Sequence, residues 1–176
     1  MKRFNNVRKA LFVLFVSSLF VTNGFAAAKK STKAAGSQLV MDSAIKQGTF
    51  RNGMTYFIRE NSEPKNRIQL RLVVKAGSCM EDEDQKGIAH FVEHLCFNGT
   101  KNFAKSAIVD YFEKIGMSFG PEVNAYTHFE QTVYMLELPA DNIEMLKTSL
   151  LVLHDWASAV TFDPEEIEKE RGVVIE

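Results

Sequence analysis

The chain has 176 residues, of which 45% are hydrophobic and 24% charged, and its formal net charge at neutral pH is −1. This length and hydrophobic fraction are sufficient for one globular core, and the balanced charge argues against a nucleic-acid partner. We therefore expect one folded domain and no nucleic-acid binding.

The first residues differ in character from the rest of the chain. Four Lys and Arg residues precede a short apolar run at residues 10–21, and small residues at 24–28 offer cleavage sites, as in a secretory signal peptide. A membrane span needs about 20 apolar residues, so this run is too short for an anchor. We expect residues 1–28 to be removed, residues 29–37 to form a flexible linker, and residues 38–176 to fold in the periplasm or outside the cell, without membrane attachment.

Strand patterns begin near residue 49. Asn52-Gly53 accepts the positive φ angles of a type I′ turn, so residues 49–51 and 54–58 are expected to form a hairpin. In residues 67–74, apolar and polar residues alternate, which predicts a strand with one buried face. That face contains Ile68, Leu70, Leu72 and Val74.

The stretch at residues 90–94 carries the most specific pattern in the chain. Gly87 before it and an Asn-Gly-Thr stop signal after it mark the ends of a helix with helically spaced apolar residues. On a helix, His90 and His94 stack on one face, where one Zn²⁺ can take a ring nitrogen from each. Glu93 shares that face and can accept a proton from a metal-bound water, whose pKa zinc lowers to about 7. The alternative is a set of hydrogen-bonded core groups, but the spacing favours a zinc hydrolase.

The later elements alternate between helices and strands. Helices are predicted at residues 106–115, at 141–159 and from the Asp163-Pro164 N-cap onward, and short strands at 122–126 and 132–138. The resulting order is three strands, two helices, two strands and two helices. This order predicts an α+β fold, with helices packed on one face of a mostly antiparallel sheet.

Three stretches of the chain resemble one known family of enzymes. Residues 90–100 resemble the signature of the inverted-motif zinc peptidases, which include pitrilysin, insulin-degrading enzyme and the mitochondrial processing peptidases. Residues 116–134 resemble that family's substrate-facing strand, and residues 168–176 resemble the segment that brings its third zinc ligand. The resemblance implies a zinc-dependent endopeptidase that hydrolyses peptides or small proteins with one Zn²⁺ per chain. Residues 38–176 would be its N-terminal domain, incomplete at the C-terminus, with further domains of the same chain as partners.

The resemblance also assigns roles to individual residues. His90 and His94 are its metal ligands, and Glu93 is its proton acceptor, which later returns the proton to the leaving amine. Glu170 corresponds to a supporting carboxylate beside the metal, although it could also be one of the solvated charges around it. The third ligand is expected one residue beyond Glu176. Glu176 itself could substitute, but adjacent helical positions point about 100° apart.

Asn124 and Ala125 are the residues that the resemblance assigns to substrate binding. They would lie on an edge strand to which a peptide or unfolded protein adds as a further strand, so that backbone hydrogen bonds hold substrates of many sequences. The alternative is an ordinary strand with a turn residue at its start.

Two alternatives to an active enzyme remain open. A non-catalytic family member would keep the fold and act as a peptide-binding or partner subunit, although such subunits typically lose the His-Glu-His pattern. A structural zinc module would need four protein ligands, and the sequence offers no clear fourth.

The chain contains two cysteines, Cys79 and Cys96. They could pair in an oxidising compartment, but the position of Cys96 just after the histidines favours a small buried residue.

Overall fold

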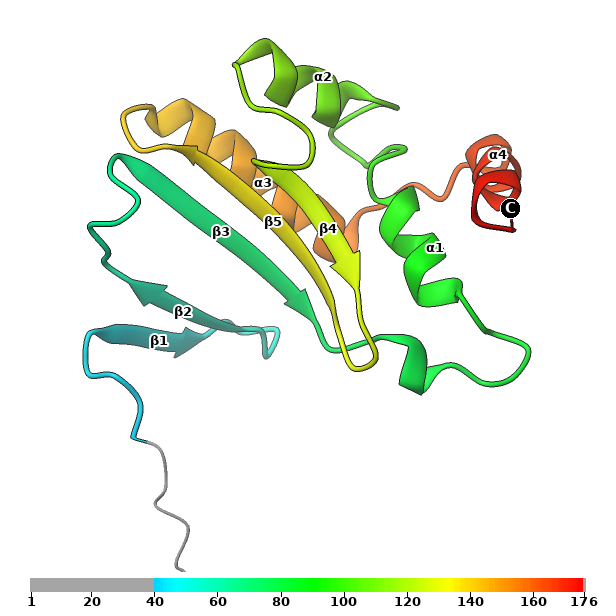
Figure 1. Ribbon diagram of the computed structural model, residues 1–176, viewed down its shortest axis with the longest axis horizontal. Helices are drawn as coiled ribbons and strands as arrows, with labels where there is room; N and C mark the ends of the chain where they lie inside the picture. Colours follow the sequence, from blue (N-terminus) through cyan, green and yellow to red (C-terminus); the bar gives the residue numbers. More distant parts are fainter. Residues whose placement is uncertain (1–39, 176) are drawn as a thin grey trace, which may run out of the picture. The chain divides into compact units, whose positions relative to one another are not determined.

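Residues 40–175 are described by a computed structural model, in which all helices and strands belong to one unit, Ser43–Glu176. The predicted signal peptide at residues 1–28 and the predicted linker at 29–37 lie outside the described residues. The elements are β1 (Ile45–Thr49), β2 (Thr55–Arg59), β3 (Arg67–Val74), the 3₁₀ helix η1 (Ser78–Met80), α1 (Ile88–Leu95), α2 (Ala107–Lys114), β4 (Val123–Thr127), β5 (Thr132–Pro139), α3 (Ile143–Ser158) and α4 (Pro164–Ile175) (Figure 1). Apart from η1, this order of strands and helices is the predicted one.

The larger sheet has three antiparallel strands in the order β3-β5-β4. Leu70 of β3 and Val123 of β4 both lie opposite Leu136 of β5. Because side chains alternate along a strand, this register aligns the predicted apolar face of β3 with the buried face of β5. Val74 is an exception to the predicted face, because it lies at the end of β3 and is 36% exposed.

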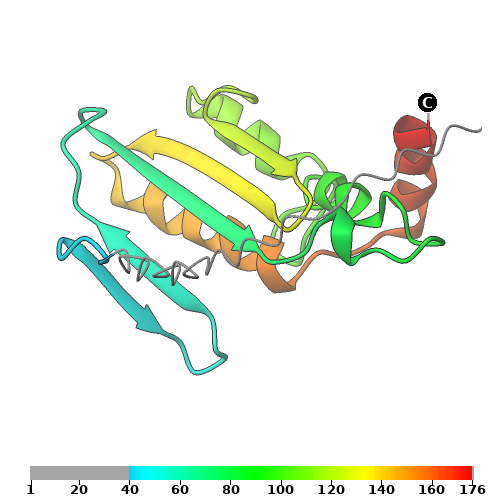
Figure 2. The same cartoon turned by 60° about the horizontal axis from the view of Figure 1, so that its bottom comes forward.

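Two helices, and the residue that follows a third, contribute to one core with this face of the sheet. Ile108 and Phe112 come from α2, Val152 and Trp156 come from α3, and Cys96 directly follows α1. Figure 2 shows α3 running along the sheet. The structure therefore confirms the α+β fold with helices on one face of an antiparallel sheet. Within the part of the chain that the structure describes, no helix is long and apolar enough to cross a membrane.

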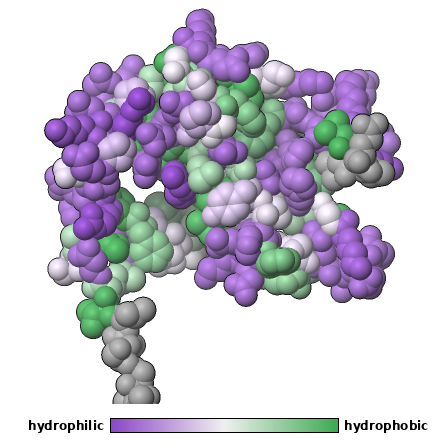
Figure 3. Space-filling view, in the orientation of Figure 1, coloured by the Kyte–Doolittle hydropathy of each residue, from purple (hydrophilic) through white to green (hydrophobic). Residues whose placement is uncertain are grey.

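β1 and β2 form a separate antiparallel sheet of two strands, with Thr49 opposite Thr55. The predicted hairpin is therefore present, but its first strand ends at residue 49 instead of spanning 49–51. Phe57 and Ile58 of β2 are more than half exposed, and Figure 3 shows apolar residues gathered over this hairpin.

The turn of this hairpin differs from the predicted type I′ turn. Gly53 has a φ of 87°, whereas Asn52 is not among the residues with positive φ. Gly53 donates its N–H to the carbonyl of Phe50 at 2.9 Å, which is the pattern of a type I turn followed by a glycine bulge. Asn52 instead uses its side-chain oxygen to accept the N–H of Met54 at 3.1 Å. The Asn-Gly pair therefore predicted the position of the turn but not its type.

Two helix ends follow their predicted signals. α2 ends in a Schellman motif, because Gly116 has a φ of 83° and donates to the carbonyl of Glu113 at 2.9 Å, while Met117 donates to that of Phe112 at 2.9 Å. α4 begins at Pro164, where the carboxylate of Asp163 accepts two backbone N–H groups of the first turn.

Candidate metal centre

The start of α1 is capped by a carboxylate that precedes it by several residues. Gly87 has a φ of 89°, and the N–H groups of Gly87 and Ala89 donate to the two oxygens of Glu81 at 2.8 and 2.7 Å. These hydrogen bonds, chiefly the one from Ala89, hold the pKa of Glu81 below its ordinary value. A carboxylate at this end also interacts favourably with the helix dipole. Glu81 was not predicted, because in the sequence it is one of four consecutive acidic residues.

The end of α1 is held by two neighbouring residues of α3. Trp156 donates from Nε1 to the carbonyl of Cys96 at 2.9 Å. Asp155, which is fully buried, accepts hydrogen bonds from the Thr100 hydroxyl at 2.7 Å and from the backbone and side chain of Asn102 at 3.0 and 2.9 Å. Burial raises the pKa of Asp155, but the hydrogen bonds outweigh it and leave the pKa below its ordinary value. α3 therefore determines where α1 ends and how the next loop turns.

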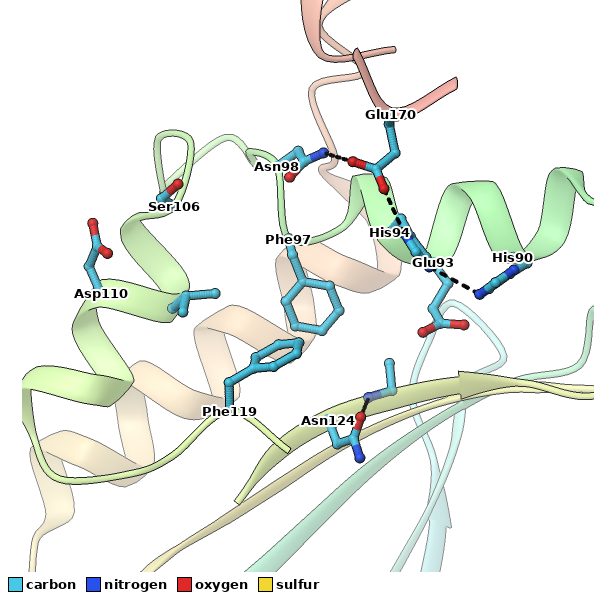
Figure 4. Close-up of a pocket in the computed structure, with 12 residues that line it drawn as sticks. His90, Glu93, His94, Phe97, Asn98, Ser106, Asp110, Phe119, Asn124 and Glu170 are labelled. Atoms are coloured by element: carbon cyan, nitrogen blue, oxygen red, sulfur yellow. Dashed lines mark hydrogen bonds and ion pairs between the residues drawn. The ribbon is translucent and has the colours of Figure 1, made fainter. Parts of the chain in front are cut away.

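His90 and His94 converge on one side of α1. Their Nε2 atoms lie 3.0 Å apart, and their rings meet edge to face. Glu170 of α4 lies 2.6 Å from His94 Nδ1, and Asn98 donates from Nδ2 to the other Glu170 oxygen at 3.0 Å (Figure 4). Because His94 Nδ1 faces a carboxylate, the ring proton belongs on Nδ1, and Nε2 keeps its lone pair for a metal ion.

The two imidazoles fit a zinc ion as part of a ligand set. In a tetrahedral site with Zn–N distances of about 2.0–2.1 Å, two nitrogen ligands lie about 3.3 Å apart. The observed separation of 3.0 Å needs only a small adjustment to reach that value. Within residues 40–175, no group of three or more His, Cys, Asp or Glu side chains could hold a metal ion together. The resemblance predicts the third ligand one residue beyond Glu176, which is past the end of the 176-residue sequence.

Glu93 is nearly buried beside the histidines, with 7% of its surface exposed. Its carboxylate points away from α1 toward β4 (Figure 4). There the hydroxyl of Thr127 donates to Glu93 Oε2 at 2.7 Å. The Glu93 carboxylate is thus held by one strong hydrogen bond and lines the same pocket as His90 and His94.

One pocket of about 640 Å³ gathers the predicted site. All six predicted residues line it: His90, Glu93, His94, Asn124, Ala125 and Glu170. An apolar part follows, where the rings of Phe97 and Phe119 meet edge to face with centroids 5.4 Å apart (Figure 4). A polar end joined to an apolar wall is a common design for a site that orients a ligand and buries part of it.

Asn124 and Ala125 lie on β4, which is an edge strand of its sheet. His128 donates its N–H to the carbonyl of Gln131 at 2.8 Å, just past the end of the β4–β5 ladder. Hydrogen-bonded pairs alternate along an antiparallel ladder, so the backbone groups of Asn124 face β5 and those of Ala125 face the open edge. The Ala125 N–H is met there by Asn124 Oδ1 at 2.8 Å.

The two cysteines are unpaired. Cys79 is exposed, whereas Cys96 is 1% exposed and its Sγ lies 3.1 Å from the Tyr134 hydroxyl. Burial raises the pKa of Cys96 to about 11. Cys96 is therefore a small buried residue and takes no part in a disulfide with Cys79.

Asn98 and Thr127 contact the site but were not predicted. Asn98 was interpreted only as part of a helix stop, and Thr127 only as part of the segment, residues 116–134, that resembles the family's substrate-facing strand. Their contacts with the site join distant positions of the sequence, because Asn98 and Glu170 are 72 positions apart and Thr127 and Glu93 are 34 apart.

The fold and the helix-borne His pair together define the class of inverted-motif zinc-peptidase domains. Residues 56–176 match the model of the insulinase family, peptidase family M16, and the chain belongs to this family.

Several relatives carry similar names. The chain is 42% identical over 167 residues to the "Probable zinc protease PqqL" of Haemophilus influenzae. This alignment covers 95% of this chain and 17% of the relative. It is 43% identical over 129 residues to the "Zinc protease PQQL-like" of Arabidopsis thaliana, covering 73% of this chain and 14% of the relative. The crystal structure of the first half of the periplasmic protease PqqL from Escherichia coli matches with a TM-score of 0.74 and 38% identity, over 77% of this chain and 29% of that one. The chain thus spans less than a fifth of these full-length relatives.

Proposed function

We propose that residues 43–176 carry two zinc ligands and the proton-transfer group of an exported metalloendopeptidase. The observation that carries this proposal is the convergence of His90 Nε2, His94 Nε2 and the Glu93 carboxylate on one pocket, with Glu170 against the far side of the His94 ring. Membership of the insulinase family and the naming of relatives as zinc proteases support the same conclusion.

Each of these residues has a separate task in the proposed reaction. His90 and His94 hold one Zn²⁺ through their Nε2 atoms, and Glu170 keeps the His94 ring in the required tautomer. When bound, the ion polarises a peptide carbonyl and lowers the pKa of a coordinated water. Glu93 accepts a proton from water and passes it to the nitrogen of the leaving amine.

The substrate is a peptide or an unfolded protein that pairs with the open edge of β4. An incoming carbonyl can accept the Ala125 N–H once Asn124 Oδ1 releases it, so that the Asn124 amide acts as a temporary partner for that donor. Recognition through backbone groups selects extended chains and tolerates many side chains.

Export and further domains complete the proposal. Residues 1–28 have the pattern of a cleavable signal peptide, and the Escherichia coli relative is described as a periplasmic protease. One solved relative with 29% identity, the ferredoxin protease FusC, is described in complex with Arabidopsis ferredoxin. Because these relatives are several times longer than residues 1–176, we propose that parts outside this sequence complete the substrate site.

The decisive experiment separates metal binding from proton transfer in the protein expressed from its complete gene. Chelation should abolish cleavage of a quenched peptide, and added Zn²⁺ should restore it. Glu93→Gln should retain zinc and lose cleavage, whereas His90→Ala and His94→Ala should lose both. Zinc content per chain and turnover are measured on the same preparations.

Two results would contradict the proposal. Cleavage that survives chelation would rule out the metal mechanism, and loss of zinc in a folded Glu93→Gln variant would show that Glu93 is a ligand and not the proton acceptor. A protein that binds zinc and peptide without any turnover would instead be the non-catalytic family member, a peptide-binding or partner subunit.

A further inference from the structure

We propose that Thr127, the last residue of β4, is a positioning residue for Glu93 of α1. The Thr127 hydroxyl holds one oxygen of the carboxylate and so orients the other for proton transfer. This inference rests on the proposed function, in which Glu93 transfers the proton.

The direction of the hydrogen bond follows from the chemistry of the two groups. An ionised carboxylate can only accept, so the 2.7 Å contact must be donated by Thr127 Oγ1 to Glu93 Oε2. In the described part of the chain, this is the one side-chain hydrogen bond that Glu93 makes. A charge-assisted bond of this length is among the stronger ones in proteins.

The second carboxylate oxygen, Glu93 Oε1, is left available. Among the described residues, Ser149 Oγ is the one buried side-chain nitrogen or oxygen atom without a hydrogen-bond partner. Within residues 40–175, Glu93 Oε1 has no hydrogen-bond partner and is not in that class, so it is not fully buried, and Glu93 lines the pocket. One oxygen is thus held by the sheet, and the other is accessible on a residue that lines the same pocket as His90 and His94.

Thr127 is itself held in place by the strand pair. It lies opposite Thr132 at the end of the β4–β5 ladder, where the two hydroxyl oxygens are 3.4 Å apart. Thr132 donates its own proton to the carbonyl of Ala76 at 3.0 Å. Because each hydroxyl has a single proton, Thr132 leaves the Thr127 proton free for Glu93. The pairing of β4 with β5 therefore fixes the position of the Thr127 hydroxyl that donates to Glu93.

The hydroxyl can be tested apart from the shape of the side chain. Thr127→Val keeps the branched shape and loses the donor, whereas Thr127→Ser keeps the donor and loses a methyl group. Hydrogen bonds to charged groups contribute enough for Thr127→Val to lower kcat by about 10–100-fold. Zinc content and KM should stay near those of the wild type, because neither depends on where the proton acceptor points. Thr127→Ser should recover most of kcat.

Thr132→Val is the matched control. It removes a hydroxyl from the neighbouring strand and breaks the bond to Ala76, but leaves the contact with Glu93 intact. Its kcat should remain near that of the wild type even if its stability falls. If Thr127→Val does not accumulate as a folded protein, Thr127→Ala replaces it and should show the same loss of kcat.

The outcomes distinguish this inference from the function on which it rests. Glu93→Gln inactive with Thr127→Val at full kcat would overturn the positioning role and leave the proposed function intact. Equal losses in Thr127→Ser and Thr127→Val, or a parallel loss of zinc, would assign Thr127 a purely structural role. An active Glu93→Gln variant would remove the proposed function itself.

Discussion

Glu170 acts on the candidate site through a single imidazole. It lies 2.6 Å from His94 Nδ1 and is held in turn by the Asn98 amide. Carboxylates in this position orient a metal-binding histidine and raise the basicity of its other nitrogen. Its effect should therefore appear in metal affinity before it appears in the fold.

We expect Glu170→Gln to weaken zinc binding by about 10–100-fold, because the amide cannot supply the negative charge that supports the His94 tautomer. Competition with a chelator of known affinity measures the change. Glu168→Gln is the control, because Glu168 lies on the same helix and pairs with Arg171 at the surface. If both variants bind zinc like the wild type, Glu170 is an ordinary member of the charged run on α4.

At the scale of elements, α1 depends on a cap outside itself. The carboxylate of Glu81 accepts the backbone N–H groups of Gly87 and Ala89, and its pKa is lowered below the ordinary 4.5 of a glutamate. Because the pKa is lowered in the folded state, the ionised carboxylate stabilises the fold at pH values above the ordinary glutamate pKa. That stabilisation is lost as the pH falls through the lowered pKa.

Glu81→Gln should therefore unfold at lower urea concentration than the wild type at neutral pH. The difference between the two proteins should shrink in acid, where the wild-type carboxyl is protonated as well. Glu83→Gln serves as the control, since Glu83 makes an exposed ion pair with Lys86. A difference that does not change with pH would mean that Glu81 acts through shape and not through its charge.

A second element-scale contact lies where the segment before α1 passes the β4–β5 turn. A Cβ atom on Gly77 would press on the carbonyl of His128 and lie 2.7 Å from that of Phe129. Ser78 and Cys79 donate backbone hydrogen bonds to these same two carbonyls. The absence of a side chain at Gly77 is therefore a condition for this crossing.

Gly77→Ala should cost about 3 kcal/mol or more of unfolding free energy, because backbone atoms cannot move aside as a side chain can. Gly53→Ala in the hairpin should cost only about 1–2 kcal/mol, the penalty for placing an L-residue in the left-handed region. At Gly53 a Cβ would meet nothing within 4 Å. Denaturant titration of both variants measures the two losses of unfolding free energy. Similar losses would show that the backbone at Gly77 can move away from the β4–β5 turn at little cost.

These elements also show how far the sequence could lead. The strand at β3 and the helices followed from apolar spacing, and the pairing of His90 with His94 followed from a local helical interval. The turn at Asn52 was wrong in type, because the same dipeptide serves two turn geometries. Glu81 and Thr127 could not be predicted, since each meets α1 only after distant segments have packed.

At the scale of the whole molecule, four separate segments converge on α1. Glu81 caps its start, Trp156 binds the carbonyl just after its end, Thr127 holds Glu93, and Glu170 meets His94. The site therefore depends on packing between segments that are spread over residues 81–170 of the chain. Zinc affinity and folding should consequently be coupled.

The unequal burial of the two cysteines allows this folding to be followed by thiol labelling. Cys79 should react at once with a maleimide or an aromatic disulfide, whereas Cys96 should not react in the folded protein. Its pKa of about 11 leaves little thiolate at neutral pH, and its burial excludes the reagent. For these two cysteines, we expect one label in the native protein, at Cys79, and two in denaturant, as assigned by peptide mass spectrometry. Fast modification of both thiols in the native protein would show that the core is open.

The rate of the second labelling step then reports how often the core opens. Cys96 directly follows the His-bearing helix, and its Sγ lies against the Tyr134 hydroxyl of β5, so the reagent can reach it only when this end of α1 separates from the core. The labelling rate of Cys96 thus measures how often this end of α1 opens. It can be read in any variant described above, without a peptide substrate and without a metal.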